Sequence, residues 1–218
     1  MDLLLPDGLK ALIRDRYLAG VSDALAKYPF SAADEDSLTG ALGNSISMPQ
    51  AVVFGDGQRR YSYQVSYRKI RGRGPRAPEK QLGADGIFQI EVTDDHGRQT
   101  KGLPFQSKKG WSSADSNLLK QASRMLETAG DGIVIDYRPD RFSACRAEDV
   151  VRNHANRNLI ERTGKSRPLG QLLGDDFLDC RIGRAGLFFD PITETWEGVA
   201  IGPSTVEQII TTRVSKIS

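Results

Sequence analysis

Three polar residues occupy positions in a predicted β-hairpin where core side chains would be expected. Asp85 opens the first strand pattern of the stretch 83–109, and Gln106 and Lys108 close the second. A carboxylate and an amide can supply oxygen ligands to a divalent cation, and an ammonium group can hold negative charge. This hairpin is therefore the candidate site, provided that neighbouring elements bring the three side chains together.

Side-chain alternation indicates which of these residues share a face. In a strand that starts at Asp85, Glu91 lies on the same face but roughly 20 Å away, so the two acids cannot bind one ion. Gln106 and Lys108 share a face of the second strand. A turn at His96-Gly97 pairs residues whose numbers sum to about 193, within one or two residues of register. Lys108 then lies opposite Asp85 with Gln106 on the same patch; the alternative is a surface hairpin with an ordinary Asp–Lys pair.

Two predicted helices flank the hairpin in the sequence. Glu35 lies in the first turn of one, where a carboxylate either complements the helix dipole or serves the site. The other helix spans about residues 118–126 and has an apolar stripe that includes Leu118, Ala122 and Met125. Gln121 flanks that stripe, so it either borders the buried face or points toward the hairpin.

Basic residues cluster between the predicted strands. The stretch 59–80 has eight basic residues and one acid; its first part, residues 60–70, has the alternation of a strand, and the Gly and Pro residues that follow predict a loop. This loop is either solvated or a flexible arm that contacts phosphates, because clustered arginines donate bidentate hydrogen bonds. The candidate nucleic-acid contacts are Arg68, Arg71, Arg73, Arg76 and Lys109.

The composition is typical of a soluble globular protein. The chain has 218 residues, of which 39% are hydrophobic and 27% charged, and a net charge of +2. Because no apolar run approaches the ~20 residues of a membrane span and the N-terminus has no basic signal-peptide region, we expect a cytoplasmic protein without a membrane partner. Two cysteines and two histidines without metal-ligand spacing indicate reduced thiols and argue against a zinc site.

In order and spacing, these motifs resemble the PD-(D/E)xK nuclease superfamily, and more narrowly its Mrr-like branch, in which Gln replaces the second acid. The resemblance covers about residues 33–150. It joins a helical acid, Gly83-Ala-Asp85 at a strand start, Gln106-Ser-Lys108 in a strand, a helix that often carries Gln, and the strand 132–137. It implies an α/β fold with a restriction-endonuclease-like core, whose central mixed β-sheet is flanked by helices. Residues 1–30 would add an N-terminal helix to this single domain, and residues 151–218 a C-terminal elaboration.

The resemblance also implies individual roles. Asp85 maps to the metal-binding acid, Gln106 to the amide in place of the second acid, Lys108 to the motif lysine, Glu35 to the helical acid and Gln121 to the helical Gln. Asp85, Glu35 and Gln106 would hold Mg²⁺ or Mn²⁺, which lowers the pKa of bound water and neutralises phosphate charge. Lys108 would stabilise the charge of the transition state. The implied reaction is endonucleolytic hydrolysis of DNA phosphodiester bonds, in restriction or antiphage defence, by a homodimer or with a defence-system partner protein.

Two alternatives stay open, because fold alone does not determine function. Since Gln106 replaces an acid, the first is a nucleic-acid-binding protein that keeps the fold with weak or no cleavage. The second is a structural protein of a larger complex, which would leave the basic loop without a phosphate partner.

Overall fold

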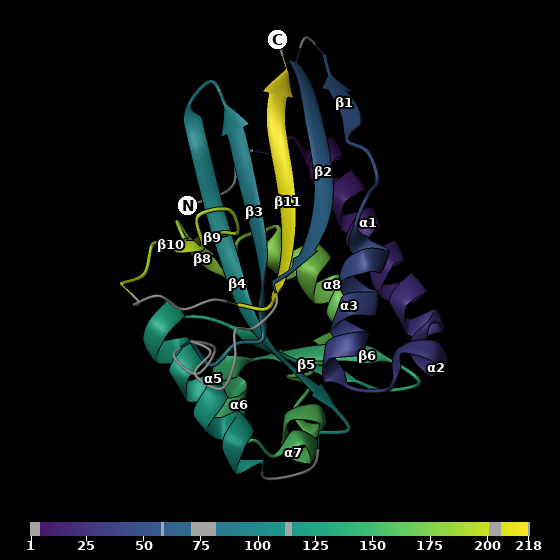
Figure 1. Cartoon of the computed structure of the whole chain (residues 1–218), viewed down its shortest axis with the longest axis vertical. Coiled ribbons are helices and arrows are strands. Elements are labelled where there is room, and N and C mark those ends of the chain that lie inside the picture. Colours follow the sequence, from purple (N-terminus) through teal and green to yellow (C-terminus); the bar gives the residue numbers. More distant parts are fainter. Residues whose placement is uncertain (1–4, 58, 71–81, 112–114, 201–205, 218) are drawn as a thin grey trace.

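A large mixed β-sheet forms the centre of the fold (Figure 1). The computed structural model describes residues 5–57, 59–70, 82–111, 115–200 and 206–217. The sheet strands are β1 (Val52–Asp56), β2 (Arg59–Lys69), β3 (Gly86–Asp94), β4 (Gly97–Lys109), β5 (Ile133–Tyr137), β6 (Phe142–Arg146), β7 (Arg167–Pro168), β8 (Arg184–Ala185) and β11 (Gln208–Ile217). Their order is β1-β2-β11-β3-β4-β5-β6-β7, with β8 paired to β4, and a separate ribbon joins β9 (Phe188–Asp190) to β10 (Thr195–Glu197).

Helices cover both faces of this sheet. They are α1 (Asp7–Ala26), α2 (Tyr28–Ser31), α3 (Glu35–Ile46), α5 (Ser116–Ala129), α6 (Ala147–Arg152), α7 (Arg157–Arg162), α8 (Leu169–Gln171) and the π-helical turn η1 (Leu172–Phe177). One hydrophobic core includes α1, α3 and Phe105 of β4, and a second includes α5, α6 and Val134 of β5. The predicted α/β architecture with a central mixed sheet and flanking helices is therefore confirmed.

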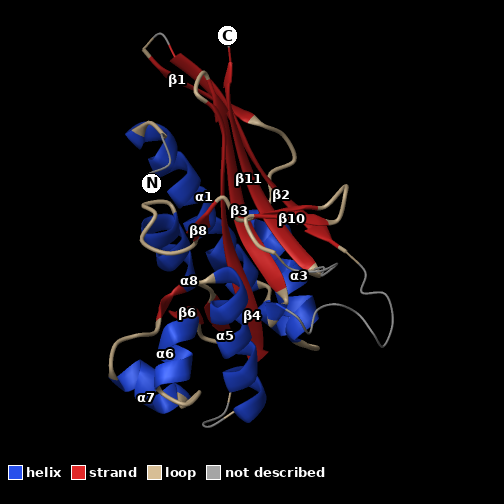
Figure 2. Cartoon of the chain, turned by 90° about the vertical axis from the view of Figure 1, so that its left-hand side faces the viewer, coloured by secondary structure: helices blue, strands red, loops and turns tan. Residues whose placement is uncertain are grey.

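The long strands extend past the helices. In Figure 1 the ends of β2, β11, β3 and β4 project upward, and in the perpendicular view of Figure 2 α1 lies along the side of these strands. Among the described residues, no helix is long and apolar enough to cross a membrane.

The C-terminal strand lies in the middle of the sheet. β11 pairs antiparallel with β2 and parallel with β3, and its residues 208–212 are all buried. Residues 151–218 were predicted to be a C-terminal elaboration of the single domain, and their last strand lies between β2 and β3. The C-terminal segment is therefore needed to complete the central sheet.

The β3–β4 hairpin and α5 form as expected, with a shift in register. β3 ends at Asp94 and β4 begins at Gly97, so the turn is Asp95-His96. The helix α5 buries Leu118, Ala122 and Met125 and connects β4 to the parallel strand β5. The predicted strand, helix and strand of residues 97–137 are confirmed.

Candidate functional site

The hairpin register places Asp85 opposite Gln106 rather than opposite Lys108. Gly86 pairs with Phe105, and the backbone N–H of Asp85 donates to the Phe105 carbonyl at 2.9 Å. The predicted pairing was therefore two residues off, because the two-residue turn pairs residues whose numbers sum to 191. Lys108 lies beyond the start of β3, next to Asp136 of β5.

The carboxylate of Asp85 caps the part of β4 that extends beyond its pairing with β3. Its Oδ2 atom accepts hydrogen bonds from Gln106 Nε2 (2.6 Å), Ser107 N (2.8 Å) and Ser107 Oγ (2.7 Å). Since β3 starts only at Gly86, the carboxylate occupies the place where a neighbouring strand would offer a carbonyl to Ser107 N. Oδ1 makes no hydrogen bond with any residue that the structure describes, and it remains available to a ligand.

Glu35 joins α3 to the end of β4. The helix starts where Asp34 accepts a hydrogen bond from Ser37 N at 2.7 Å, so Glu35 lies in the first turn as expected. Glu35 Oε1 accepts from the backbone N–H of Lys109 at 3.0 Å, and Oε2 lies 3.9 Å from Lys108 Nζ. The Lys108 side chain is only 14% exposed, so its ammonium group is held close to this carboxylate.

Glu35 and Asp85 line one pocket of about 130 Å³. Two further acids, Asp36 and Glu207, line it as well, together with Thr39, Ser107 and Gln208. Asp36 pairs with Lys69 and accepts a hydrogen bond from Gln208 Nε2. We call this cavity the acidic pocket. Lys69 and Lys108 each pair with one of its acids, Asp36 and Glu35 respectively.

The negative charge of the acidic pocket also affects a neighbouring tyrosine. Tyr67 donates its hydroxyl hydrogen bond to Gln208 Oε1. Burial and then the nearby Asp36 carboxylate raise the pKa of Tyr67 to about 12. The hydroxyl is therefore a hydrogen-bond donor at neutral pH and not an additional anion.

Two glutamine oxygens lie buried on the α5 side. The side-chain oxygens of Gln106 and Gln121 are both inaccessible and have no hydrogen-bond partner in the described part of the chain. Gly83, at a φ of +75°, lets the chain pass against α5, since a Cβ there would lie 2.4 Å from the Gln121 carbonyl oxygen. The Gln106 amide thus holds Asp85 through its nitrogen and keeps its oxygen free. No hydrogen bond between described residues joins the Gln121 side chain to Asp85 or Gln106.

The structure describes two of the five residues predicted to contact nucleic acid, Arg68 and Lys109. Arg68 is exposed on β2, whereas Arg71, Arg73 and Arg76 lie outside the described residues. Lys109 donates from Nζ to the carbonyl of Ala32, so its ammonium group fastens the chain before α3 to the end of β4. Its direct contact with nucleic acid stays a prediction.

Three residues of this site, Ser107, Asp36 and Glu207, had no signal in the sequence. Ser107 lies between the two motif residues and supplies two of the three hydrogen bonds to Asp85. Strand alternation predicted that the Ser107 side chain lies on the opposite face from Gln106. Both side chains reach the carboxylate of Asp85 because Asp85 lies just before the start of β3. Asp36 and Glu207 had no spacing signal, since they are 171 positions apart and meet through β11.

The arrangement fits a cation held mainly by substrate and water. Among the described residues, no group of three or more His, Cys, Asp or Glu side chains is arranged around one metal position. Mg²⁺ needs fewer protein ligands, because it keeps several waters and often binds through one or two carboxylates and substrate phosphate. Asp85 Oδ1 and Glu35 are the donors that suit it, whereas the predicted third ligand, the Gln106 side-chain oxygen, is buried and Gln106 does not line this pocket.

Comparison with known proteins adds no homologue. No protein-family model, curated protein or solved structure matches the chain.

Proposed function

We propose that this protein is a Mg²⁺-dependent endonuclease that hydrolyses DNA phosphodiester bonds. The observation that carries the proposal is the meeting of four predicted site residues at the end of β4. Asp85 binds Gln106, Glu35 lies beside Lys108, and the two acids line one pocket. The order of these elements also supports it, since α3 precedes the β3–β4 hairpin, with β1 and β2 between them, and α5 and β5 follow it as in the nuclease resemblance.

Each residue has a distinct part in this reaction. Asp85 and Glu35 would hold the cation, which supplies activation of water and neutralisation of phosphate charge. Gln106 and Ser107 fix the orientation of the Asp85 carboxylate, so that Oδ1 is directed to the ligand. Lys108, whose ammonium group lies 3.9 Å from Glu35, would stabilise the charge that develops on the scissile phosphate.

The setting of the reaction follows from the same resemblance. We propose restriction or antiphage defence in the cytoplasm, with Mn²⁺ able to replace Mg²⁺ and with a homodimer or a defence-system protein as the assembly. Arg68 and the basic stretch that includes Arg71, Arg73 and Arg76 would contact the DNA backbone, with Lys109 at the end of β4.

A second candidate is a nucleic-acid-binding protein that does not cleave. One observation favours it: Asp85 Oδ2 is fully used by Gln106 and Ser107, so this carboxylate also has a structural function. Such a protein would bind DNA equally with Mg²⁺ and with a chelator and would leave it intact.

A gel assay separates these candidates. Purified protein is incubated with supercoiled plasmid, linear DNA and RNA, each with Mg²⁺, Mn²⁺ or EDTA. We expect nicking or linearisation of DNA with either cation and none with EDTA. Retarded but intact DNA under all conditions would support the second candidate, and cleavage of RNA alone would refute the assignment of DNA as substrate.

A further inference from the structure

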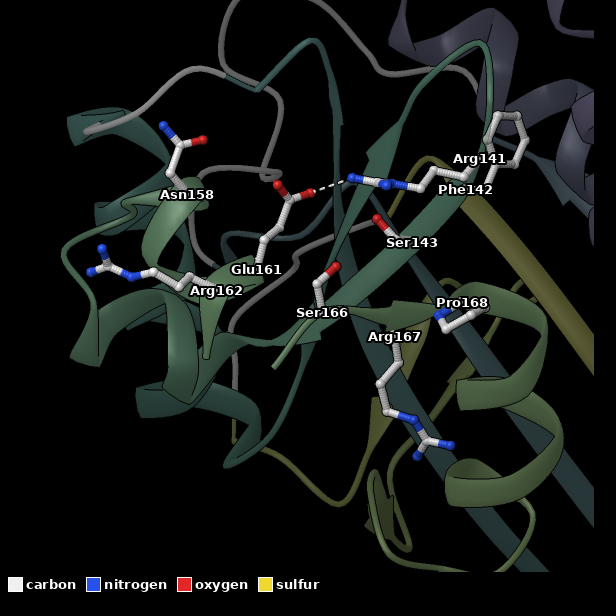
Figure 3. Close-up of a pocket in the computed structure, with 9 residues that line it drawn as sticks. All are labelled: Arg141, Phe142, Ser143, Asn158, Glu161, Arg162, Ser166, Arg167 and Pro168. Atoms are coloured by element: carbon white, nitrogen blue, oxygen red, sulfur yellow. Dashed lines mark hydrogen bonds and ion pairs between the residues drawn. The ribbon is translucent and has the colours of Figure 1, made fainter. Parts of the chain in front are cut away.

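A second and larger pocket lies at the β6–β7 edge of the sheet, beside α7 (Figure 3). Its volume is about 640 Å³, within the range of small-molecule sites and several times that of the acidic pocket. Its polar lining includes Arg141, Ser143, Glu161, Arg162 and Ser166. We call it the arginine pocket. The proposed cleavage reaction uses none of these residues.

The polar ends of four of these side chains converge. In Figure 3, Arg141, Ser143, Ser166 and Glu161 point to a common region, whereas the guanidinium groups of Arg162 and Arg167 turn outward. Arg167 is also occupied by ion pairs to two acids, Asp175 and Asp176. The donors that face the middle of the pocket are therefore one guanidinium group and two hydroxyl groups.

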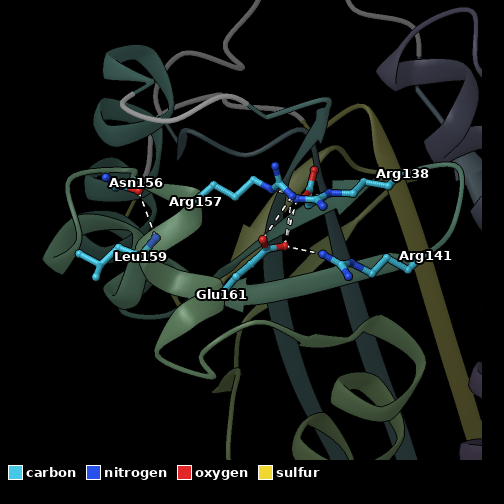
Figure 4. A network of polar contacts seen from close by, with 7 residues as sticks. Arg138, Arg141, Asn156, Arg157, Leu159 and Glu161 are labelled. Atoms are coloured by element: carbon cyan, nitrogen blue, oxygen red, sulfur yellow. Dashed lines mark hydrogen bonds and ion pairs between the residues drawn. The ribbon is translucent and has the colours of Figure 1, made fainter.

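The single acid of the pocket is already neutralised (Figure 4). Glu161 accepts hydrogen bonds from Arg138 (3.0 Å), Arg141 (2.7 Å) and Arg157 (3.2 Å). Arg138 and Arg157 also donate to the buried carboxylate of Asp136, at 2.8 and 2.9 Å. Three guanidinium groups thus face two carboxylates, which leaves an excess of positive charge beside the pocket.

Two donors in the pocket remain available. Arg141 is 48% exposed and uses only Nη2 toward Glu161, so most of its five N–H donors are free among the described contacts. Ser143 is 5% exposed, and its hydroxyl has no hydrogen-bond partner in the part of the chain that the structure describes. A buried hydroxyl without a partner is costly, so a ligand or a bound water is expected to satisfy it.

These features suit a phosphate group attached to a larger molecule. A guanidinium group with neighbouring hydroxyls matches the oxygen geometry of phosphate, and the positive excess favours an anion. The volume far exceeds that of phosphate alone. Phe142 and the exposed Pro168 add apolar wall that can contact a sugar or base.

We propose that the arginine pocket binds a nucleotide through its phosphate, with Arg141, Ser143 and Ser166 as donors. The nucleotide is either free or part of a nucleic-acid strand. The second source fits the sheet register, because Lys108 is next to Asp136 and Asp136 is next to Ser143. Two strand spacings amount to about 10 Å, so a strand bound at Lys108 can reach the arginine pocket.

Calorimetric titration of the full-length protein tests this proposal. The probes are adenosine 5′-monophosphate, adenosine, inorganic phosphate and a short single-stranded oligodeoxynucleotide, all with EDTA so that cleavage does not interfere. Saturable binding of the monophosphate, with at least tenfold weaker binding of adenosine, would identify a free nucleotide as the ligand. Binding of the oligonucleotide alone, lost on substitution of Arg141, would identify a nucleotide within a strand.

Matched variants assign the binding to this pocket. Arg141→Ala should weaken binding about 10- to 100-fold, because a charge-assisted hydrogen bond is lost. Ser166→Ala, which removes one donor without a change of charge, should weaken binding severalfold. Arg152→Ala makes the same charge change as Arg141→Ala on an exposed side chain of α6 and should leave binding unchanged. The proposal is refuted if no probe binds, if adenosine binds as tightly as its monophosphate, or if both pocket variants bind like the wild type.

Discussion

The structure predicts that Asp85 stabilises the fold as well as serving the site, and that two substitutions separate these roles. Asp85→Ala removes the acceptor of three hydrogen bonds, from Gln106 Nε2, Ser107 N and Ser107 Oγ. Asp85→Asn keeps a carbonyl oxygen in the place of Oδ2 and puts its amide nitrogen where Oδ1 has no described partner. The two variants thus differ mainly in whether the edge of β4 remains capped.

The size of each effect follows from these contacts. Gln106 is 2% exposed and Ser107 3% exposed, so water does not readily replace the lost acceptor. A buried donor left unsatisfied costs about 1–3 kcal/mol, and the Ser107 hydroxyl can rotate to another acceptor. We therefore expect Asp85→Ala to lower the free energy of unfolding by about 2–4 kcal/mol and Asp85→Asn by about 1 kcal/mol.

Urea denaturation followed by circular dichroism measures both changes, with cleavage rates determined on the folded proteins. Ser107→Ala is the matched control, because it removes one hydroxyl donor and should cost about 0.5–1.5 kcal/mol. Asp85→Asn should lose Mg²⁺-dependent cleavage while remaining folded. An Asp85→Ala protein as stable as the wild type, or an Asp85→Asn protein destabilised as strongly as Asp85→Ala, would refute the capping role.

Two further predictions concern the stability of the contact between Gly83 and α5 and of the contact between Lys101 and η1. Gly83→Ala should lower the free energy of unfolding by about 1–3 kcal/mol, because φ is +75° and the added Cβ would lie 2.4 Å from the Gln121 carbonyl oxygen. Thermal unfolding measures this change, and an unchanged midpoint would contradict it. Burial lowers the pKa of Lys101, whose ammonium group donates to the Phe177 carbonyl. Since the unfolded chain then binds the proton more tightly, the wild type should gain stability relative to Lys101→Met as pH rises from the lowered pKa toward 10.5. Chemical denaturation at pH 7 and pH 10 checks the sign, and a stability difference that stays constant or moves the other way would be inconsistent with it.

The local features of the site could be predicted from sequence because they depend on short-range patterns. Strand alternation placed Gln106 and Lys108 on one face, and the helical spacing placed Glu35 in a first turn. The register differs by two residues from the centre of the predicted range, because both strands continue through polar residues up to the turn. Asp94 Oδ1 accepts a hydrogen bond from His96 N at 2.8 Å, which stabilises a turn one residue earlier than expected.

Long-range features had no comparable signal. The first five residues of β11 are buried on both faces, so the strand lacks the alternation that would have indicated a half-buried strand. Its place between β2 and β3 depends on pairing with segments more than a hundred residues away. The grouping of Arg138, Arg157 and Glu161 likewise arises only when β5 and α7 pack together.

The most direct test of the nuclease proposal is the single-turnover rate of plasmid cleavage by the wild type and by Lys108→Ala at saturating Mg²⁺. Lys108 makes one described ion pair, 3.9 Å long, so its removal should change stability little. Lys120→Ala, an exposed lysine of α5, is the control for the change in charge. We predict a loss of about 10²- to 10³-fold for Lys108→Ala and none for Lys120→Ala. A Lys108→Ala protein that cleaves at the wild-type rate would contradict the proposed site.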